Sequence, residues 1–407
     1  MSSIGFTRGE TPYKNRDALL DDYTPDELVG RDDELKEYQS LLNPVIWGDQ
    51  PNNIFLYGKA GVGKTAATRF MLGQLEHDAK QYDDIDLSTL HINCDGLESS
   101  YQVGVEIVNS LRDSRNQISE SGYSKAEIYN KMWRALEQTA NTILIVLDEV
   151  DHVRKDDSIL YQLSRAHENG KLNETKIGVI GISNDMTFRS HLSSKVRSSL
   201  CERELSFSDY NAAELKKVLQ QREAVAFKDD AVADGVISLC AALAAQETGD
   251  AREGLDYLLV AGDLARDEQS QIVQESHVHQ GKKKVERQTI VKGLADRGEQ
   301  ARYVAYALAT LLAEEQQPAR FTDLYTRYES LTSRTGSRTL SERWVREHLQ
   351  SLGMLGIVSI EEKNEGVSGG HYNLYGLNPK LELVVEALDE TLDMVGVHDS
   401  ISDYVDH

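Results

Sequence analysis

The stretch Asn53–Thr65 reads Asn-Ile-Phe-Leu-Tyr-Gly-Lys-Ala-Gly-Val-Gly-Lys-Thr, and it decides the fold class of the 407-residue chain. Its first part, Ile54–Tyr57, is a short apolar run that is typical of a buried β-strand. The part that follows matches G-x-x-x-x-G-K-[ST], the pattern of a phosphate-binding loop. Because a strand precedes the loop and a helix-forming segment follows it, the sequence predicts a nucleotide-binding turn rather than a glycine-rich turn without a ligand.

The residue types of this loop suit a nucleoside triphosphate. Glycines let backbone N–H groups turn toward phosphate oxygens, which a Cβ atom would obstruct. Lys64 brings a positive charge to the β- and γ-phosphates, and the Thr65 hydroxyl can complete the ligand shell of Mg²⁺. The helix that starts here points the positive end of its dipole at the same anion. The loop residues expected to hold the nucleotide are Gly58, Gly61, Val62, Gly63, Lys64, Thr65 and Ala66.

The composition indicates an acidic, globular, multidomain chain. The length favours two or three domains, and the formal net charge is −23, with 67 acidic and 44 basic residues. A hydrophobic content of 40% argues against a disordered acidic chain. The acids are spread over most of the sequence, which predicts the solvated acidic shell of a protein from a halophile; an ordinary acidic cytosolic protein is the alternative.

The three cysteines are an odd number without metal-ligand spacing, so we expect buried free thiols in a reducing compartment. They are Cys94, Cys201 and Cys240. No signal peptide opens the chain, and the longest apolar run, Ile143–Leu147, is too short to span a bilayer. We therefore expect a soluble cytoplasmic protein with no membrane partner.

The segment Thr142–Val150 reads as a fully apolar strand that ends in two acids. A continuous apolar run is what a strand buried on both faces requires. At its carboxyl end, Asp148 can hold Mg²⁺, usually through water, and Glu149 can orient and deprotonate the attacking water. The alternative is a strand that merely ends in surface acids.

Strands alternate with helices on both sides of this segment, which predicts a parallel α/β sheet with ligands at the carboxyl ends of its strands. Asn184 follows one such strand and could position the attacking water or touch the γ-phosphate, although an Asn after a strand is more often a turn residue. Asp32 is expected to cap the first helix. The expected strands are 90–93 and 177–182, and the expected helices are 32–42, 103–111 and 125–139.

An all-helical region is expected from Phe207 to about Arg266, followed by a polar linker at 267–288. Arg252 lies near a helix start and could reach a phosphate; a surface ion pair is the alternative. The first 22 residues are polar and are read as an irregular arm.

The last part of the chain has the pattern of a winged helix-turn-helix. Residues 281–347 carry 13 basic and nine acidic residues, a local reversal of the overall charge. Helices are expected at 300–314, 321–331 and 341–352, the last capped by Ser341, with Trp344 among its non-core positions. Two β-type runs, 357–361 and 372–375, would form the wing. The third helix would enter the major groove; a winged module used only for protein contacts is the alternative.

Together these features resemble the archaeal origin-recognition and helicase-loader proteins, which are related to subunit one of the eukaryotic origin recognition complex and to cell division control protein six. The resemblance covers about residues 23–377, and its motifs are specific in their order and spacing rather than one by one. The motifs are Tyr23–Leu35, Gly58–Thr65, Leu147–Asp151, Ile182–Asp185, Lys195–Leu200, Tyr210–Leu215, Gly249–Arg252 and the winged tail.

The resemblance implies an arm at 1–22, an AAA+ ATPase core at 23–205, an all-α lid at 206–280 and a C-terminal winged-helix domain at 281–400. It implies ATP or ADP with Mg²⁺ as ligands and a slow ATPase activity. Asn184 takes the place of the first sensor and Arg252 that of the second. Tyr210 and Arg222 sit where the lid meets the nucleotide, and the stretch with Val29 and Arg31 flanks the base from the other side.

Two departures from the family pattern concern charge. At the position of the trans-acting arginine the chain offers Lys195 or Arg197, and Arg197 is favoured because a planar bidentate donor suits a phosphoryl group better. The hairpin tip, 364–371, is poor in basic residues. By the resemblance, the insert at about 112–122 occupies the place of the family's initiator-specific motif, which touches DNA. The expected DNA contacts are Arg112, Arg115, Arg338, Arg343, Arg346, Lys363 and His371.

The implied function is a replication initiator that binds double-stranded origin DNA, acts with other copies of itself, associates with the chromosome and recruits the replicative minichromosome maintenance helicase. Two alternatives stay open: a nucleotide-gated DNA-binding regulator with little turnover, and an AAA+ switch that acts on protein. In molar salt, phosphate contacts lose affinity, so shape, base-edge and backbone-amide contacts should dominate.

Overall fold

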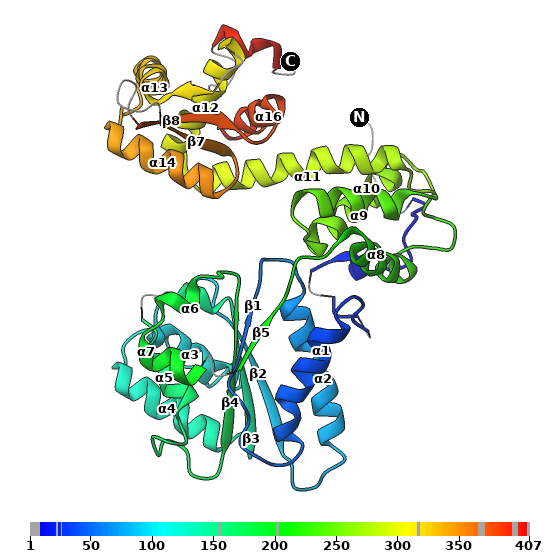
Figure 1. Ribbon diagram of the computed structural model, residues 1–407, viewed down its shortest axis with the longest axis vertical. Coiled ribbons are helices and arrows are strands. Elements are labelled where there is room, and N and C mark those ends of the chain that lie inside the picture. Colours follow the sequence, from blue (N-terminus) through cyan, green and yellow to red (C-terminus); the bar gives the residue numbers. More distant parts are fainter. Residues whose placement is uncertain are drawn as a thin grey trace. The chain divides into compact units, whose positions relative to one another are not determined.

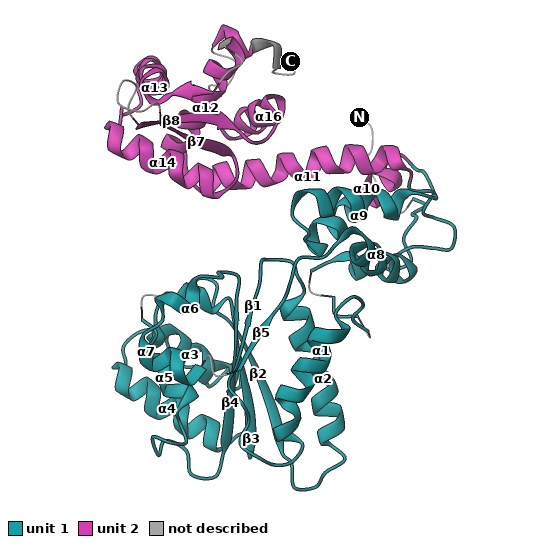
Figure 2. Cartoon of the chain, viewed as in Figure 1, with its two compact units in different colours: residues 1–259, 269–273 teal, residues 260–268, 274–407 magenta. Residues whose placement is uncertain are grey.

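The computed structural model describes residues 9–21, 23–25, 27–153, 156–200, 203–315, 318–364, 371–392 and 398–404. The chain forms two compact units (Figure 2), one made of residues 1–259 and 269–273 and the other of residues 260–268 and 274–407. No helix in the described part of the chain is long and apolar enough to cross a bilayer.

A five-stranded parallel sheet forms the centre of the first unit, in the order β2-β3-β4-β1-β5. Parallel pairing brings the carboxyl ends of β1, β3 and β4 to one edge of the sheet. The sheet confirms the predicted fold class; β3 ends at Asp148, two residues before the predicted end. The strands are β1 (Ile54–Tyr57), β2 (Leu87–Asn93), β3 (Thr142–Asp148), β4 (Lys176–Ser183) and β5 (Arg203–Ser206).

Helices cover both faces of this sheet, with α1 and α2 on one face and α3 to α7 on the other (Figure 1). Alternate residues of β3 serve the two apolar cores: Leu144 and Val146 belong to the side of α1 and α2, and Ile145 belongs to the other side. This explains why the strand is apolar without a break. The helices are α1 (Asp32–Leu42), α2 (Lys64–Ala79), α3 (Ser100–Ser110), α4 (Lys125–Glu137), α5 (Ser158–Ser164), α6 (Phe188–His191) and α7 (Ser194–Leu200), with short 3₁₀ turns at Asn43–Val45 and Val150–Val153.

The cap of α1 differs from the prediction. Arg31, not Asp32, is the N-cap residue, and no side chain makes a cap hydrogen bond there. Asp32 instead lies in the first turn together with two further acids, where negative charge is favoured by the helix dipole.

The lid follows β5 and consists of α8 (Ala212–Ala226), α9 (Val236–Glu247) and α10 (Ala251–Asp267). Residues predicted as an irregular arm pack against it from Tyr13 onward. The ring of Tyr13 stacks on Phe227 at 4.9 Å, and a 3₁₀ turn at Arg16–Leu19 buries Leu19. This packing could not be predicted, because the few apolar residues of the arm show no helical or strand period.

The second unit is an α/β module with the helices and strands predicted for a winged helix. Its small antiparallel sheet has the order β6-β8-β7, and Tyr306, Leu324 and Val345 lie in its core. The predicted linker enters a helix at Glu275, and the hairpin tip at 365–370 lies outside the described residues. The elements are α11 (Glu275–Ala295), α12 (Gly298–Glu315), β6 (Ala319–Arg320), α13 (Phe321–Thr335), α14 (Glu342–Met354), β7 (Val358–Asn364), β8 (His371–Leu377), α16 (Leu381–Thr391) and a 3₁₀ turn at Asp399–Tyr404.

Two of the three cysteines, Cys94 and Cys240, are buried free thiols, as predicted, and burial raises the pKa of each to about 12. Cys201 lies outside the described residues.

Candidate functional site

The phosphate-binding loop depends on glycine at two positions. Gly63 is the N-cap residue of α2 with φ +92°, and a Cβ atom there would lie 2.8 Å from the Tyr210 hydroxyl. Gly61 has φ +70°, and a Cβ atom would lie 1.4 Å from a carboxylate oxygen of Asp250 on the lid. Both conformations are in the left-handed region, which favours glycine. The loop is therefore shaped both by its own backbone and by the lid residues packed on it.

Lys64 connects the loop to the end of β4. Its Nζ donates to the carbonyl oxygens of Gly58 at 2.8 Å and Lys59 at 2.6 Å, and to Asn184 Oδ1 at 2.9 Å. Burial lowers the pKa of Lys64 to about 8, against the attraction of Asp148. The side chain is thus held by neutral oxygens, and the structure brings together Asn184 and the loop lysine that sequence reasoning assigned to one site.

The predicted metal ligands are in contact. The Thr65 hydroxyl donates to Asp148 Oδ2 at 2.8 Å, and Asp148 Oδ1 accepts from the backbone N–H of Glu149 at 3.0 Å. A hydroxyl and a carboxylate are the oxygen ligands that Mg²⁺ prefers. The donor set therefore fits the predicted ion.

Glu149 adopts a backbone conformation that is costly for a residue with a side chain. Its φ is +54°, in the left-handed region, at the turn that follows β3. Its carboxylate lies 3.5 Å from Asn184 Nδ2 and 3.9 Å from His152 Nε2, and His152 Nδ1 lies 3.7 Å from Asp95. The turn directs the carboxylate toward the edge of the sheet where the loop lies. Sequence reasoning did not single out His152, which falls three residues after Glu149 in the same turn.

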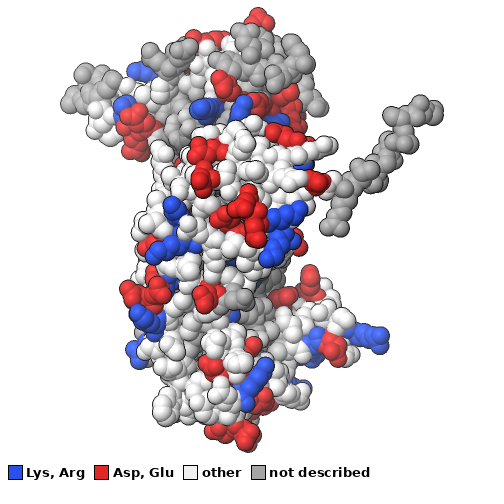
Figure 3. Space-filling model, turned by 90° about the vertical axis from the view of Figure 1, so that its right-hand side faces the viewer, with Lys and Arg blue, Asp and Glu red and all other residues white. Residues whose placement is uncertain are grey.

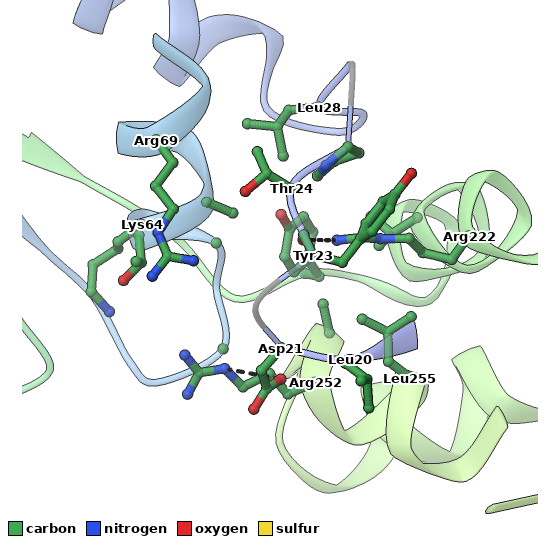
Figure 4. A pocket seen from close by; sticks show the side chains of 18 of the residues that line it. Leu20, Asp21, Tyr23, Thr24, Leu28, Lys64, Arg69, Arg222, Arg252 and Leu255 are labelled. Atoms are coloured by element: carbon green, nitrogen blue, oxygen red, sulfur yellow. Dashed lines mark hydrogen bonds and ion pairs between the residues drawn. The ribbon is translucent and has the colours of Figure 1, made fainter. Parts of the chain in front are cut away.

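A pocket lies between this edge and the lid, within the first unit (Figure 4). Lys64 and Arg69 reach it from α2, and Arg252 reaches it from α10, where it also lies 3.7 Å from Asp21. Other walls are apolar, which suits a base, while the cations suit phosphates. Sequence reasoning missed Arg69, although it falls one turn after Thr65. The other lining residues that were not predicted are Leu20, Asp21, Tyr23, Thr24, Pro25, Leu28, Asn93, Val218, Gln221, Ala251 and Leu255.

Most of the predicted nucleotide contacts line the pocket, but Arg31 does not. The predicted site residues that do are Val29, Gly61, Gly63, Lys64, Thr65, Ala66, Asp148, Glu149, Asn184, Tyr210, Arg222 and Arg252. Gly58 and Val62 belong to the loop without lining the pocket.

Arg31 is instead buried, with only 2% of its surface exposed, and we call its contacts with the phosphate loop and the lid the Arg31 clasp. Its guanidinium donates to the carbonyl oxygens of Val62 at 2.8 Å and Ser208 at 2.6 Å, and lies 3.7 Å from the centre of the Tyr210 ring. The side chain therefore ties the phosphate loop to the start of the lid rather than flanking a base. Its neighbour Val29 does face the pocket.

Arg222 has a similar double position. It lines the pocket, while its guanidinium donates to the carbonyl oxygens of Ala18 at 3.3 Å and Tyr23 at 3.1 Å and lies over the Tyr23 ring at 4.6 Å. Burial lowers its pKa from the usual range. A lid arginine therefore holds the end of the predicted arm, and Tyr23 directly after it, at the rim of the pocket.

Arg197 lies on α7 and does not line the pocket of its own chain. This position is compatible with a residue that would act on the nucleotide of a neighbouring copy. Lys195, the other candidate, is exposed on the same short helix.

The insert with Arg112 and Arg115 is the loop between α3 and α4. Ile118 anchors it, because the backbone N–H and carbonyl of Ile118 pair with the side chain of Asn109 at 2.7 and 3.1 Å. Arg112 donates to the carbonyl of Asn116 at 3.2 Å, and Arg115 is exposed. The loop thus presents at least one exposed arginine from an anchored base.

On the second unit, α14 packs through Val345, Leu349 and Leu352. Its arginines are paired within the helix: Arg343 lies 3.2 Å from Glu347 and Arg346 lies 3.7 Å from Glu342. The Arg346 guanidinium also lies 3.3 Å from the centre of the Phe321 ring. Ser341 is the N-cap residue, as predicted, but its side chain makes no cap hydrogen bond.

The remaining predicted DNA contacts lie around this helix. Arg338 is exposed in the loop before α14, His371 is exposed at the start of β8, and Lys363 pairs with Glu361 on β7. The local basic excess at 281–347 does not extend to the whole predicted domain. Residues 281–400 contain 15 basic and 18 acidic residues.

Part of this basic charge is used internally, since Lys283 and Arg287 both pair with Glu386 on α16. On the face that Figure 3 shows, acidic and basic side chains are interspersed rather than separated. On this face, the described residues show no broad basic field.

A parallel sheet with a phosphate loop, an acid pair at the end of β3, an asparagine after β4 and a helical lid that reaches the same pocket defines an AAA+ ATPase fold, here followed by a winged-helix domain. Family models match in the same order: an AAA domain at 48–183, a Cdc6 AAA+ ATPase-type lid domain at 216–283 and a CDC6 C-terminal winged helix domain at 294–387. The chain belongs to the ORC1/Cdc6 family of archaeal DNA replication proteins.

Similar proteins cover nearly the whole chain. ORC1-type DNA replication protein 11 of Haloarcula marismortui is 50% identical over 98% of this chain and 97% of its own length, and ORC1-type DNA replication protein 10 of Halobacterium salinarum is 41% identical over 96% and 95%. Both sources are halophilic archaea, in line with the acidic shell that the composition predicts. The Aeropyrum pernix ORC1 protein, solved in complex with DNA, is similar with a TM-score of 0.81 and 32% identity over 93% of this chain and 97% of that one.

Proposed function

We propose that this chain is an ATP-dependent replication initiator that binds double-stranded origin DNA and helps to recruit the replicative minichromosome maintenance helicase. The observation that carries the proposal is the pocket that joins Lys64, Asp148, Glu149 and Asn184 of the core to Arg252 of the lid, in a chain that also has a winged-helix domain. The DNA complex of the similar Aeropyrum pernix ORC1 protein supports the choice of partner.

The residues of the pocket have distinct roles in the proposed hydrolysis of ATP. Lys64 would leave its carbonyl partners to neutralise the β- and γ-phosphates, and Asn184, 2.9 Å from Lys64, would orient the attacking water. Glu149 would take a proton from that water. Mg²⁺, held by Thr65 and Asp148, would supply charge that stabilises the departing phosphate.

The lid can report on the nucleotide because it touches the phosphate loop directly. The backbone N–H of Ala251 donates to the carbonyl of Gly61 at 3.3 Å, and Asp250 packs against the same glycine. A triphosphate in the loop would displace or attract these groups and so change the angle between lid and core, a hinge-type switch. Burial raises the pKa of Asp250, which fits a carboxylate held near the space that phosphates would enter.

Footprinting tests the proposal. Purified protein is incubated in molar KCl with chromosomal fragments that contain mapped replication start sites, with ATP, with ADP and without nucleotide. We expect protection of a specific stretch near a start site that strengthens with ATP. Equal protection of unrelated fragments, or protection that vanishes at molar salt, would contradict an origin-binding role. Pull-down of the helicase by DNA-bound protein tests recruitment separately.

A further inference from the structure

We propose that Trp344 supplies an apolar contact to the methyl group of a thymine in the major groove, and that this contact carries specific affinity at salt concentrations that weaken phosphate contacts. The inference rests on the proposed binding of DNA by the winged-helix domain. It deepens that proposal by naming a base-reading residue that lies outside the set of charged contacts predicted from sequence.

Trp344 is not a core residue. Its side chain is 55% exposed, while Val345, Leu349 and Leu352 of the same helix are fully buried. An exposed indole presents a large apolar surface to water at a cost in free energy. A binding partner that covers this surface would therefore gain affinity. Trp344 is not among the residues of the apolar core of the second unit.

The position on the helix suits contact with base edges. Trp344 is the third residue of α14 (Glu342–Met354), the helix that corresponds to the recognition helix of a helix-turn-helix. Recognition helices contact base edges mainly through residues near their N-terminus. Met354, which is 80% exposed at the other end of the same helix, lacks this position and serves as an internal comparison.

The paired charges of α14 favour a non-ionic contact with DNA. Glu342 and Glu347 balance Arg343 and Arg346, and each arginine lies within ion-pair distance of one of these acids. A helix without net charge gains little from the release of counterions around DNA. Whatever specific affinity it has at high salt must come from contacts that salt does not screen.

The thymine methyl is the apolar group that a base pair presents in the major groove, and apolar side chains recognise it by contact. The flat indole can cover this methyl without a charge and without displacing a paired arginine. Such a contact gives sequence preference for thymine at one position. Its affinity does not fall with the logarithm of salt concentration as a phosphate contact does.

The test uses the full-length protein and the duplex that it enriches from a random library in molar KCl. Dissociation constants are measured for the wild type, Trp344→Ala, Trp344→Phe and the control Met354→Ala. They are measured on this duplex and on versions in which single thymines are replaced by deoxyuridine. Deoxyuridine keeps base pairing and removes only the methyl group. Melting curves confirm that each variant is folded.

We expect Trp344→Ala to weaken binding about tenfold with an unchanged dependence on salt, Trp344→Phe to weaken it less, and Met354→Ala to leave it unchanged. One deoxyuridine position should weaken the wild type by a similar factor and leave Trp344→Ala unaffected. Equal affinity of wild type and Trp344→Ala would overturn the inference, as would a wild type that no deoxyuridine position affects. If the wild type binds DNA and neither Trp344→Ala nor any deoxyuridine replacement weakens binding, the inference fails and the proposed function stands. If the wild type enriches no duplex, the inference and the proposed function both fail.

Discussion

In the nucleotide pocket, Lys64, Arg69 and Arg252 converge on one space from two helices, whereas on α14 Arg343 and Arg346 turn back to glutamates of their own helix. The pocket gathers cations for an anion that must be held at defined atoms. On the surface of α14 the charges of the arginines are balanced by glutamates, and the ring of Trp344 is exposed.

The difference follows from what each site can gain from charge. Inside a partly closed pocket the surrounding dielectric is low, so a lysine near a phosphate contributes strongly even in concentrated salt. On an exposed helix the same charge is screened within a few ångströms at molar salt. For a chain with net charge −23, we therefore expect positive charge to contribute most inside the pocket, and the proposed binding of DNA to depend more on contacts that salt does not screen.

The largest effect is expected from Glu149→Gln. The amide keeps the shape of the side chain but cannot take a proton from water, so turnover of ATP should fall about a thousandfold while ATP binding stays unchanged. Steady-state hydrolysis and equilibrium binding of a fluorescent ATP analogue measure the two quantities.

Asp95→Asn is the matched control for that variant, because Asp95 lies near His152 but does not line the pocket. It should hydrolyse ATP at close to the wild-type rate. Turnover that survives in Glu149→Gln would assign the base to another residue.

The next largest effect is expected from Arg31, which does not line the pocket but joins the phosphate loop to the start of the lid. Arg31→Ala leaves the carbonyls of Val62 and Ser208 without their buried donor and removes the stack on Tyr210. The free energy of unfolding should fall by about 3 kcal/mol, and affinity for ATP should fall with it because the loop is no longer tied to the lid.

Arg31→Lys separates charge from geometry. An ammonium keeps the charge but cannot make both hydrogen bonds and the stack, so an intermediate loss of stability is expected. Chemical denaturation in molar KCl gives the free energies. If the lysine and alanine variants lose equal stability, geometry accounts for the whole contribution; if neither loses any, the clasp has no energetic role.

A smaller effect should appear on α14 when one of its internal pairs is broken. Glu347→Gln releases Arg343 from its partner at 3.2 Å, which makes the arginine available to a phosphate. Affinity for DNA at low salt should rise several-fold, and the plot of log affinity against log salt should steepen by about one unit. Binding titrations over a range of KCl concentrations measure both.

Glu382→Gln removes the same charge from α16 and controls for net charge alone. A matching increase in that variant would show that general repulsion from DNA, rather than the Arg343 pair, limits affinity. If only Glu347→Gln steepens the dependence of affinity on salt, the internal pair on α14 is what keeps Arg343 from DNA. The cations of α14 would then differ from those of the pocket in being used within their own helix.

Sequence motifs could assign residues far apart in the chain to one site because the chemistry of that site allows few residue types. The motif around Lys64 and the acids after β3 have fixed spacings that report phosphate and metal chemistry, and the structure places their side chains in contact. The parallel sheet followed from the same segments, since an apolar run without alternation requires two covered faces.

The parts that the sequence did not predict depend on long-range packing. The family resemblance implied that the stretch with Val29 and Arg31 flanks the base. In the structure Val29 lines the pocket, whereas the Arg31 side chain is buried against the carbonyl oxygen of Val62. The arm was read as irregular because its contacts with Phe227 and Arg222 join residues about 200 positions apart. The pairing of arginines on α14 was legible in principle, since Arg343 and Glu347 are four residues apart in a predicted helix.

The smallest effect concerns the ion pair of Asp156 and Lys125, which belongs neither to the pocket nor to α14. It shows how much a partly buried ion pair contributes to the stability of the fold. Asp156 accepts hydrogen bonds from Lys125 Nζ at 2.8 Å, from the Ser158 hydroxyl at 2.8 Å and from the backbone of Ser100 at 3.2 Å, which joins the starts of α3, α4 and α5. Burial alone would raise the pKa of Asp156, but the hydrogen bonds from Lys125 and Ser158 hold it at about 2.

Because this pKa is depressed in the folded state, the stabilisation is present above the ordinary value of 3.8 and is lost as pH falls through about 2. Asp156→Asn should lower the free energy of unfolding by about 1 kcal/mol near neutral pH, a value reduced for partial exposure. Wild type and variant should converge as pH falls toward that range. Glu168→Gln, which breaks a more exposed pair with Arg165, should change stability much less at any pH. An equal loss of stability in both variants would mean that partial burial does not strengthen an ion pair. The Asp156 pair would then not differ in kind from the exposed pairs on α14.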